Sequence, residues 1–156
     1  MVVSAARSQQ MSLIRSRDTK PELRVRKYLH AAGLRYRLHA RELPGTPDLV
    51  FPCRRAVVFV HGCFWHKHPG CRAARLPKSR LAFWGPKLDS NAARDQVVQE
   101  QLQELGWSVF VIWECESSKE HNLSMLADQL KNLPTRPRRS GNGAALRAPA
   151  RDHLRQ

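Results

Sequence analysis

The sequence predicts an α/β domain in which a mixed β-sheet is flanked by helices. The continuous apolar run over residues 56–60 is typical of a strand that is covered on both faces, and residues 107–113, apolar except for Ser108, predict a second buried strand. Stretches with apolar residues at helical spacing precede, separate and follow these runs. The resulting order of helix, strand, strand, helix, strand and helix favours a sheet with helices packed on it. A chain of 156 residues provides one such domain with its own core.

The first elements follow from the residues at their ends. Thr19 can cap a helix that Gly33 ends, and Glu22 stands at the spacing of a capping box. Pro21 is tolerated in the first turn of such a helix. The polar face of this helix is expected to hold Arg24, Arg26 and Lys27. A short strand over residues 35–39, a turn over 43–47 and strands over 48–51 and 56–60 are expected next.

The middle of the chain changes character. Residues 61–87 have no apolar period and are rich in His, Cys, Trp, Pro, Gly and basic residues, which predicts a long functional loop. Ser90 can cap a helix that runs to about Leu105. The strand over 107–113 is expected to bury Trp107 and Trp113 in the core, and a last amphipathic helix is expected to reach Leu133.

Composition separates both ends from this domain. Residues 1–18 are polar and small and predict a loose arm, whereas residues 19–133 hold the expected helices and strands. Residues 134–156 contain six arginines against one acid, with three prolines and two glycines. We expect this basic tail to be disordered.

The charge predicts a polyanionic partner. Lys and Arg number 27 against 13 Asp and Glu, which gives a net charge of +14, and no acid occurs between Asp48 and Asp89. So basic a domain most often binds nucleic acid, and a merely solubilising surface is the alternative. No apolar run approaches a membrane span and no signal-peptide pattern is present, so we expect a cytoplasmic protein without a membrane partner.

The cysteines and histidines predict a zinc site. Cys63, His68 and Cys71 can wrap one ion, and Cys115 at the end of a strand can complete a tetrahedral shell. In the alternative, the cysteines are small buried apolar groups and the histidines are surface groups. Cys53 lies apart from this set and is expected to be an idle thiol.

Three further side chains suit phosphoryl chemistry. Asp48 stands at the start of a strand and can hold Mg²⁺, which would polarise a phosphate and assist a water nucleophile. His61 and His66 can act as general acid or base. The alternatives are an aspartate that satisfies its own turn and structural histidines.

Aromatic pairs occur at both ends of the expected loop, Phe64-Trp65 and Phe83-Trp84, among basic residues. Apolar side chains can wedge between bases and unstack them. Core packing is the alternative, and it is weaker for Trp65 than for Trp84 because no alternating apolar pattern surrounds Trp65.

One string within this region is highly specific: Val60-His61-Gly62-Cys63-Phe64-Trp65-His66-Lys67-His68. Other distinctive residues and strings are Met11, Arg17-Asp18-Thr19 with Glu22, Leu43-Pro44-Gly45-Thr46-Pro47-Asp48, Phe83-Trp84, Asn91 with Arg94-Asp95, and Leu105-Gly106-Trp107 with Trp113-Glu114-Cys115. Together they resemble the very short patch repair endonucleases of bacteria, from about Met11 to Cys115.

This resemblance implies a restriction-endonuclease-like fold with a zinc-stabilised loop. It also implies an enzyme that nicks double-stranded DNA 5′ of the thymine in a T:G mismatch, which arises by deamination of 5-methylcytosine. Such an enzyme hydrolyses a phosphodiester with Mg²⁺. We expect a monomer, with repair accessory proteins as further candidate partners.

The resemblance also implies roles for individual residues. Asp48 would hold Mg²⁺ with the backbone carbonyl of Val60. His66 would activate water or relay its proton, and His61 would assist at the phosphate. Glu22 and Asp95 would be supporting acids. The implied zinc ligands are Cys63, His68, Cys71 and Cys115. The implied DNA contacts are Phe64, Trp65 and Trp84 beside the mismatch, with Met11 in the opposite groove.

The chain departs from the family pattern at two places. Val60 stands where the pattern has Thr, and Pro69-Gly70 lengthens the zinc segment by one residue. The Glu-x-Lys pair that many nucleases carry after the metal-binding Asp is also absent. A zinc-stabilised DNA-binding module without catalysis is one alternative, although it leaves Asp48, His61 and His66 without a task. A related restriction-type nuclease is the other alternative.

Overall fold

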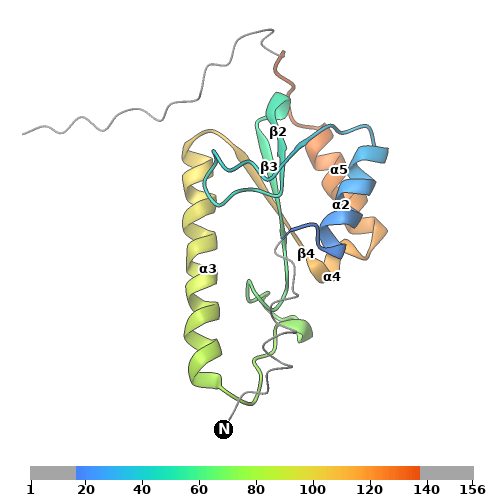
Figure 1. Cartoon of the computed structure of the whole chain (residues 1–156). Coiled ribbons are helices and arrows are strands. Elements are labelled where there is room, and N and C mark those ends of the chain that lie inside the picture. Colours follow the sequence, from blue (N-terminus) through green and yellow to red (C-terminus); the bar gives the residue numbers. More distant parts are fainter. Residues whose placement is uncertain (1–16, 138–156) are drawn as a thin grey trace, which may run out of the picture.

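The computed structural model describes residues 17–137 (Figure 1). Met11, nearly all of the expected arm over 1–18, and residues 138–156 of the expected tail therefore lie outside the described residues.

A four-stranded mixed sheet lies at the centre of the domain, with the strand order β1-β2-β3-β4. The strands are β1 (Arg37–Leu38), β2 (Leu49–Phe51), β3 (Ala56–His61) and β4 (Ser108–Trp113). The pairs β1–β2 and β2–β3 are antiparallel, whereas β3 and β4 are parallel. Because a parallel pair needs a long crossover, residues 62–80 and helix α3 (Leu81–Glu104) make that connection.

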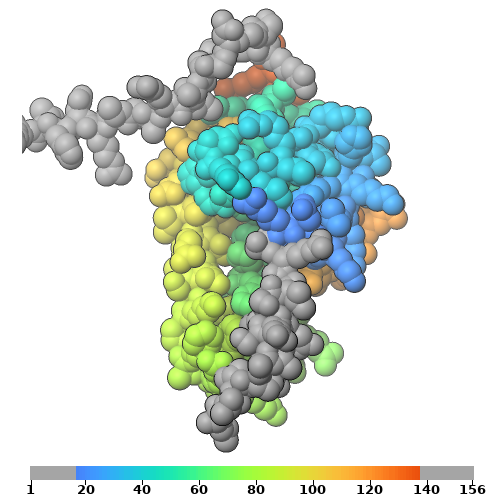
Figure 2. Space-filling view, viewed as in Figure 1, coloured from blue at the N-terminus to red at the C-terminus, as the bar shows by residue number. Residues whose placement is uncertain are grey.

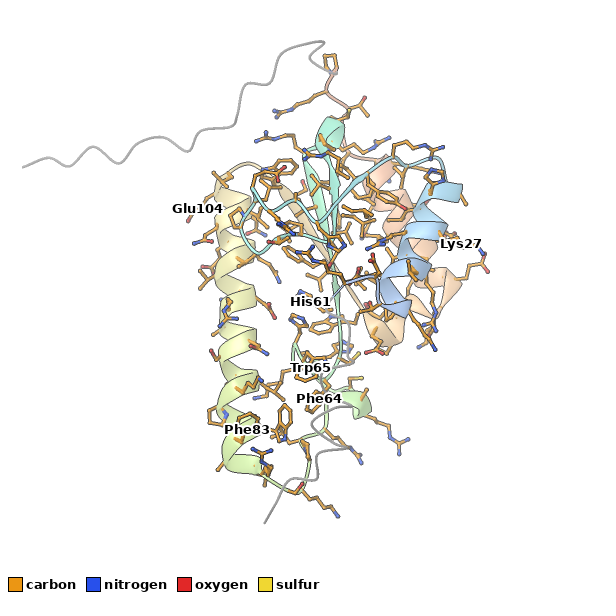
Figure 3. The ribbon with its side chains drawn as sticks, in the orientation of Figure 1. Lys27, His61, Phe64, Trp65, Phe83 and Glu104 are labelled. Atoms are coloured by element: carbon orange, nitrogen blue, oxygen red, sulfur yellow. The ribbon has the colours of Figure 1, made fainter. Side chains whose placement is uncertain are left out.

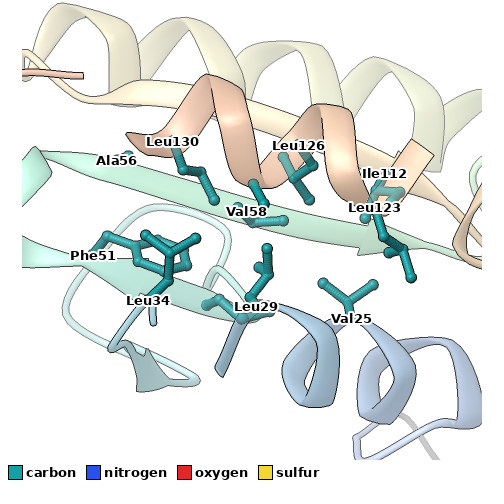
Figure 4. Packing of buried hydrophobic residues seen from close by; sticks show 12 residues of the cluster. Val25, Leu29, Leu34, Phe51, Ala56, Val58, Ile112, Leu123, Leu126 and Leu130 are labelled. Atoms are coloured by element: carbon teal, nitrogen blue, oxygen red, sulfur yellow. The ribbon is translucent and has the colours of Figure 1, made fainter. Parts of the chain in front are cut away.

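Helices cover both faces of the sheet, as the sequence predicts. Helices α2 (Lys20–Ala31) and α5 (Glu120–Lys131) lie on one face and α3 lies on the other (Figure 1). Alternate residues of β3 pack on the two faces of the sheet, because successive strand residues point to opposite faces. Ala56 and Val58 pack with α2 and α5 (Figure 4), whereas Val57 and Phe59 pack in the cluster that contains Leu102 of α3.

The helices facing the first layer have defined ends. The Thr19 side chain accepts a hydrogen bond from the Glu22 backbone N–H at 3.4 Å, so the predicted cap of α2 is confirmed. At the C-terminal end of α5, the carbonyls of Leu130, Lys131 and Leu133 accept hydrogen bonds from Arg54, each at 3.2 Å. These bonds satisfy carbonyl groups that a helix C-terminus leaves free.

The prediction that residues 61–87 form a loop is wrong for its last part. Helix α3 begins at Leu81 rather than at Ser90, and it contains Gly85 and Pro86, which favour a loop in the sequence. The fully buried Leu88 anchors this part of the helix. Tertiary packing therefore overrides the local signals, and Phe83 and Trp84 lie on a helix.

The end of the second apolar run also differs from expectation. Strand β4 begins at Ser108, and a short helix α4 (Glu114–Ser117) follows it directly, so that Cys115 lies on a helix. Only Ile112 of β4 is fully buried, because β4 is the edge strand of the sheet. Trp107 is buried as predicted, but Trp113 is only partly buried.

The turn before β2 packs closely on α3. Gly45 has a φ of +71°, in the region that favours glycine, and a Cβ atom there would overlap Val98 of α3. This close approach joins the segment that leads to Asp48 to the helix on the far face. Among the described helices, none combines the length and apolar character that crossing a bilayer requires.

Candidate functional site

Asp48 is a partly buried residue immediately before β2. Its Oδ2 accepts a hydrogen bond from the Val60 backbone N–H at 2.7 Å. Burial raises the pKa of Asp48 to about 7, with the Val60 N–H opposing and the negative Glu22 reinforcing the change. None of the ion pairs within residues 17–137 includes Asp48. A bound cation would offset the cost of ionising this carboxyl.

Two histidines and an aspartate, His61, His66 and Asp95, form a second group. His61 ends β3 and is buried, and its ring stacks on that of His66 with centroids 3.9 Å apart and planes 5° from parallel. His66 Nδ1 lies 2.6 Å from Oδ2 of Asp95, which α3 contributes. Figure 3 shows His61 between α3 and α2, at the end of the strand.

Burial lowers the pKa of His61 to about 3, and the neighbouring His66 adds to this effect. The Asp95 carboxylate orients the His66 ring through Nδ1 and leaves Nε2 without a hydrogen bond to the described residues. An imidazole held in this way is suited to transferring a proton.

Glu22 belongs to a third group, on α2. Its Oε2 accepts hydrogen bonds from Arg26 Nη2 at 2.8 Å and from the Asp18 backbone N–H at 3.0 Å. Arg26 also donates to Asp18 and contacts His39. Glu22 and Asp95 therefore approach the site from α2 and α3, on opposite faces of the sheet, rather than as one pair of acids.

Arg26 was expected on the polar face of its helix, and this expectation is wrong. The residue is buried and pairs with Glu22 one helical turn before it. Sequence reasoning also missed His39. The spacing of Glu22 and Arg26, four residues apart on one helix, is the signal that could have indicated the pair.

The four predicted zinc ligands lie together. One ligand atom each from Cys63, His68, Cys71 and Cys115 lies within 4.8 Å of every other. The Cys115 Sγ and His68 Nδ1 atoms are 3.5 Å apart, close to the roughly 3.5 Å that a tetrahedral zinc ion imposes between a sulfur and a nitrogen ligand. Three thiolates and one imidazole in this arrangement fit a structural zinc ion.

The inserted Pro69-Gly70 forms a turn that keeps Cys71 in place. The Cys71 backbone N–H donates to the His68 carbonyl at 3.3 Å, and Gly70 has a φ of +69°. Pro followed by Gly suits a turn that needs a left-handed third residue. The extra residue therefore leaves the four ligands together.

Cys63 and Cys53 differ in their surroundings. Burial is the main cause that raises the pKa of the Cys63 thiol to about 12, so ionising it requires a cation. Cys53 lies in a short 3₁₀ turn, half-buried and outside the four-ligand group. Its idle role stays a prediction.

The aromatic residues of the loop and of α3 form one cluster. Phe64 lies 5.1 Å from Trp65 and 5.4 Å from Trp84, in both cases edge to face. Phe83 is 45% exposed and lies under Arg80 and Lys87. Figure 3 shows Phe64 and Trp65 facing α3 near Phe83. The cluster is partly exposed, so its rings both pack together and remain accessible.

Trp113 contributes to the metal group and the histidine group. It stacks on His68 with centroids 4.2 Å apart and meets His61 edge to face at 5.3 Å. The prediction that Trp113 lies in the core is therefore wrong, and its ring instead contacts both groups.

Comparison with known proteins gives one consistent result. Residues 2–72 match the family model described as DNA mismatch endonuclease Vsr. A type II nicking enzyme, V.XorIIP of Xanthomonas oryzae pv. oryzae, is 54% identical over 123 residues, which cover 79% of this chain and 88% of the relative. The DNA mismatch endonuclease Vsr of Escherichia coli is 44% identical over 111 residues, 71% of this chain and 70% of the relative. The type II nicking enzyme V.NmeAIP of Neisseria meningitidis is 42% identical over 113 residues, 72% and 80% of the two chains.

Proposed function

Because the chain belongs to the family of the DNA mismatch endonuclease Vsr, we propose that it nicks double-stranded DNA 5′ of the thymine in a T:G mismatch. The family identifies a DNA-cleaving hydrolase. The T:G target, its origin in 5-methylcytosine deamination and the use of Mg²⁺ are our proposal. The observation that supports it most directly is that the Asp48 carboxyl accepts a hydrogen bond from the Val60 backbone N–H, one residue before the His61 ring that stacks on His66.

The site suits a hard divalent cation. Mg²⁺ prefers oxygen ligands and keeps several waters, and Asp48 has one oxygen engaged by Val60 and the other without a bond to the described residues. We assign Asp48 and the Val60 carbonyl to the ion. When bound, Mg²⁺ would stabilise negative charge on the phosphate.

The two histidines have different roles in the proposed reaction. His66, oriented by Asp95, accepts the proton of the attacking water at the nitrogen that Asp95 leaves free. His61 is held uncharged by burial and hydrogen-bonds at the phosphate. Glu22, on α2, is a supporting acid of the site.

Recognition lies next to this chemistry. We assign Phe64, Trp65 and Trp84 to the disrupted base step, where an apolar wedge costs least. Met11, outside the described residues, completes our assignment in the opposite groove. Zinc at Cys63, His68, Cys71 and Cys115 holds the loop that carries two of these aromatic residues. We assign the mixed sheet and its helices to the restriction-endonuclease-like fold, and we place the monomer on cytoplasmic DNA with repair accessory proteins.

Nicking of a T:G duplex tests the proposal against a matched T:A duplex, with and without Mg²⁺. We expect cleavage of the T:G duplex alone, and only with Mg²⁺. Asp48→Ala should abolish nicking, and His66→Ala should slow it by roughly 10²–10⁴-fold, while both variants still bind the T:G duplex. Asp128→Ala, which alters an exposed acid of α5, is the matched control and should cut normally.

Two outcomes favour the alternatives. A parent protein that binds T:G duplexes but never cuts them is a zinc-stabilised binding module. A parent protein that cuts T:A and T:G duplexes equally is a restriction-type nuclease. Asp48→Ala cleavage at the parent rate would remove Asp48 from the active site.

A further inference from the structure

Arg26 is a buried cation that the proposed reaction does not use. The residue is 9% exposed, and its Nη1 donates to Asp18 at 2.6 Å while its Nη2 donates to Glu22 at 2.8 Å. Its Nε is buried without a partner among residues 17–137. Buried ion pairs often contribute no more to stability than apolar residues of the same volume. A contribution to the stability of the fold therefore does not explain why Arg26 is buried.

Arg26 also reaches the strand segment beside Asp48. Its Nη2 lies 3.0 Å from His39 Nε2. Because a guanidinium only donates, His39 Nε2 accepts, and the ring proton lies on Nδ1. The backbone N–H of His39 donates to the Asp48 carbonyl at 3.2 Å. One side chain thus connects α2 to the residue pair that contains Asp48.

The hydrogen bond from Arg26 orients the Glu22 carboxylate. Glu22 Oε2 accepts from both Arg26 and the Asp18 backbone N–H. Its Oε1 makes no hydrogen bond in the described part of the chain, and Glu22 is an electrostatic neighbour of Asp48. A carboxylate that is fixed through one oxygen presents the other in a defined direction.

We propose that Arg26 is a positioning residue of the nicking reaction: it fixes the Glu22 carboxylate and contacts the His39 that bonds the Asp48 backbone, so that Glu22 Oε1 would be available to water around a cation held at Asp48. This inference rests on the proposed function, in which Asp48 holds the ion. Groups that orient the surroundings of a metal typically change its affinity by about 10–100-fold when they are replaced.

Metal affinity tests the inference without relying on cleavage. Mn²⁺, which also prefers oxygen ligands, is titrated into the full-length zinc-loaded protein and followed by electron paramagnetic resonance. Arg26→Met should weaken Mn²⁺ binding about 10–100-fold and raise the Mg²⁺ concentration for half-maximal nicking by a similar factor. Arg26→Lys should fall between parent and Arg26→Met, because an ammonium keeps the charge but loses the planar fork.

Lys27→Met is the matched control. Lys27 is the exposed neighbour of Arg26 on α2, and Figure 3 shows it pointing away from the sheet. Its replacement removes the same charge from the same helix and should leave Mn²⁺ affinity unchanged. Thermal unfolding identifies variants that fail to fold, and Arg26→Lys decides the question if Arg26→Met is one of them.

A double-variant cycle shows whether Arg26 acts through Glu22. Glu22→Gln should weaken Mn²⁺ binding, and adding Arg26→Met should weaken it little further. Additive losses, or unchanged Mn²⁺ affinity in folded Arg26 variants, overturn the inference. A parent protein that binds Mn²⁺ with this coupling but does not nick T:G DNA overturns the proposed function instead. A parent protein that binds no Mn²⁺ overturns both.

Discussion

At the residue scale, the candidate site removes ionisable groups from water. Burial raises the pKa of Asp48 to about 7 and lowers that of His61 to about 3. Both changes disfavour the charged form of the side chain. Burial therefore lowers the charge that the centre of the site would otherwise carry, and a divalent cation reverses this for Asp48 by favouring the ionised carboxylate.

Mg²⁺ should therefore stabilise the protein more at about pH 8 than at about pH 5. The folded-state pKa of Asp48, about 7, lies above its ordinary value of 3.8. Its contribution to stability is present below about pH 4 and is lost as the pH rises through about 7. Mg²⁺ offsets the loss by pairing with the carboxylate. Thermal unfolding with and without Mg²⁺ at both pH values measures the difference, and Asp48→Asn should remove it. Equal Mg²⁺ effects at both pH values would contradict the assignment.

Trp65 is the residue on which mismatch preference should depend. Its ring lies 5.9 Å from Trp84 and packs edge to face with Phe64. Trp65→Ala should erase the preference for T:G over T:A, because a wedge gains most where the base step is already weak. Competition binding with the two duplexes measures the ratio. Trp107→Phe, which alters a buried core tryptophan, is the control and should keep it. A Trp65→Ala protein that retained the full ratio would show that Trp65 only packs.

At the element scale, α3 joins the separate parts of the site. It carries Trp84 near its first turns and Asp95 near its middle, and its Asn91 donates to the Trp65 carbonyl at 3.1 Å. Its last turns pack on the sheet through Leu102. Figure 2 shows the first half of α3 and the preceding loop extending beyond the bulk of the domain. A single helix thus sets the distance between the aromatic cluster and the histidines.

The loop before α3 should depend on zinc for its structure. Of residues 62–80, only Cys63 is buried, so apolar packing contributes little to holding the loop. Cys115→Ser removes the ligand that connects the loop to the end of β4, and it should lower both zinc content and melting temperature. Cys53→Ser, outside the ligand group, should change neither. Elemental analysis and thermal unfolding measure the two effects, and a folded parent protein free of zinc would refute the site.

At the scale of the whole molecule, positive charge and the aromatic cluster occupy the same region. The segment without acids contains exposed basic residues on the loop and on the first turns of α3: Lys67, Arg72, Arg75, Lys78, Arg80 and Lys87. Cations of this kind bind phosphates regardless of base sequence, whereas the aromatic residues respond to a weakened step. In the proposed function, affinity and selectivity therefore come from different side chains.

Salt should separate these two contributions. Binding of T:G and T:A duplexes should weaken in parallel as salt rises, by roughly 10³-fold or more between about 50 and 200 mM if about six phosphates are neutralised. The ratio between the two duplexes should stay nearly constant. Binding isotherms across this range test the expectation. Affinity that is independent of salt would exclude the basic surface as the main source of binding.

The sequence by itself determined the parts of this protein that depend on near neighbours. The cap of α2 at Thr19, the doubly covered β3 and the candidate ligands Cys63, His68 and Cys71 follow from residue types and spacings, because a cap, a strand pattern and a short chelating string are local. Cys115 joins them only because β4, which precedes it, pairs with β3. The mixed sheet flanked by helices follows from the order of these elements.

Only the tertiary structure decided how residues far apart in the chain meet. The extra turns of α3, the pairing of His66 with Asp95, and the burial of Arg26 against Glu22 and His39 all contradict or escape local patterns. In each case the free energy of packing and of pairing buried charges exceeds the preference of the short segment, such as that of Gly85-Pro86 for a loop. Those contacts form only once α2 and α3 have each packed on the sheet, which no single segment encodes.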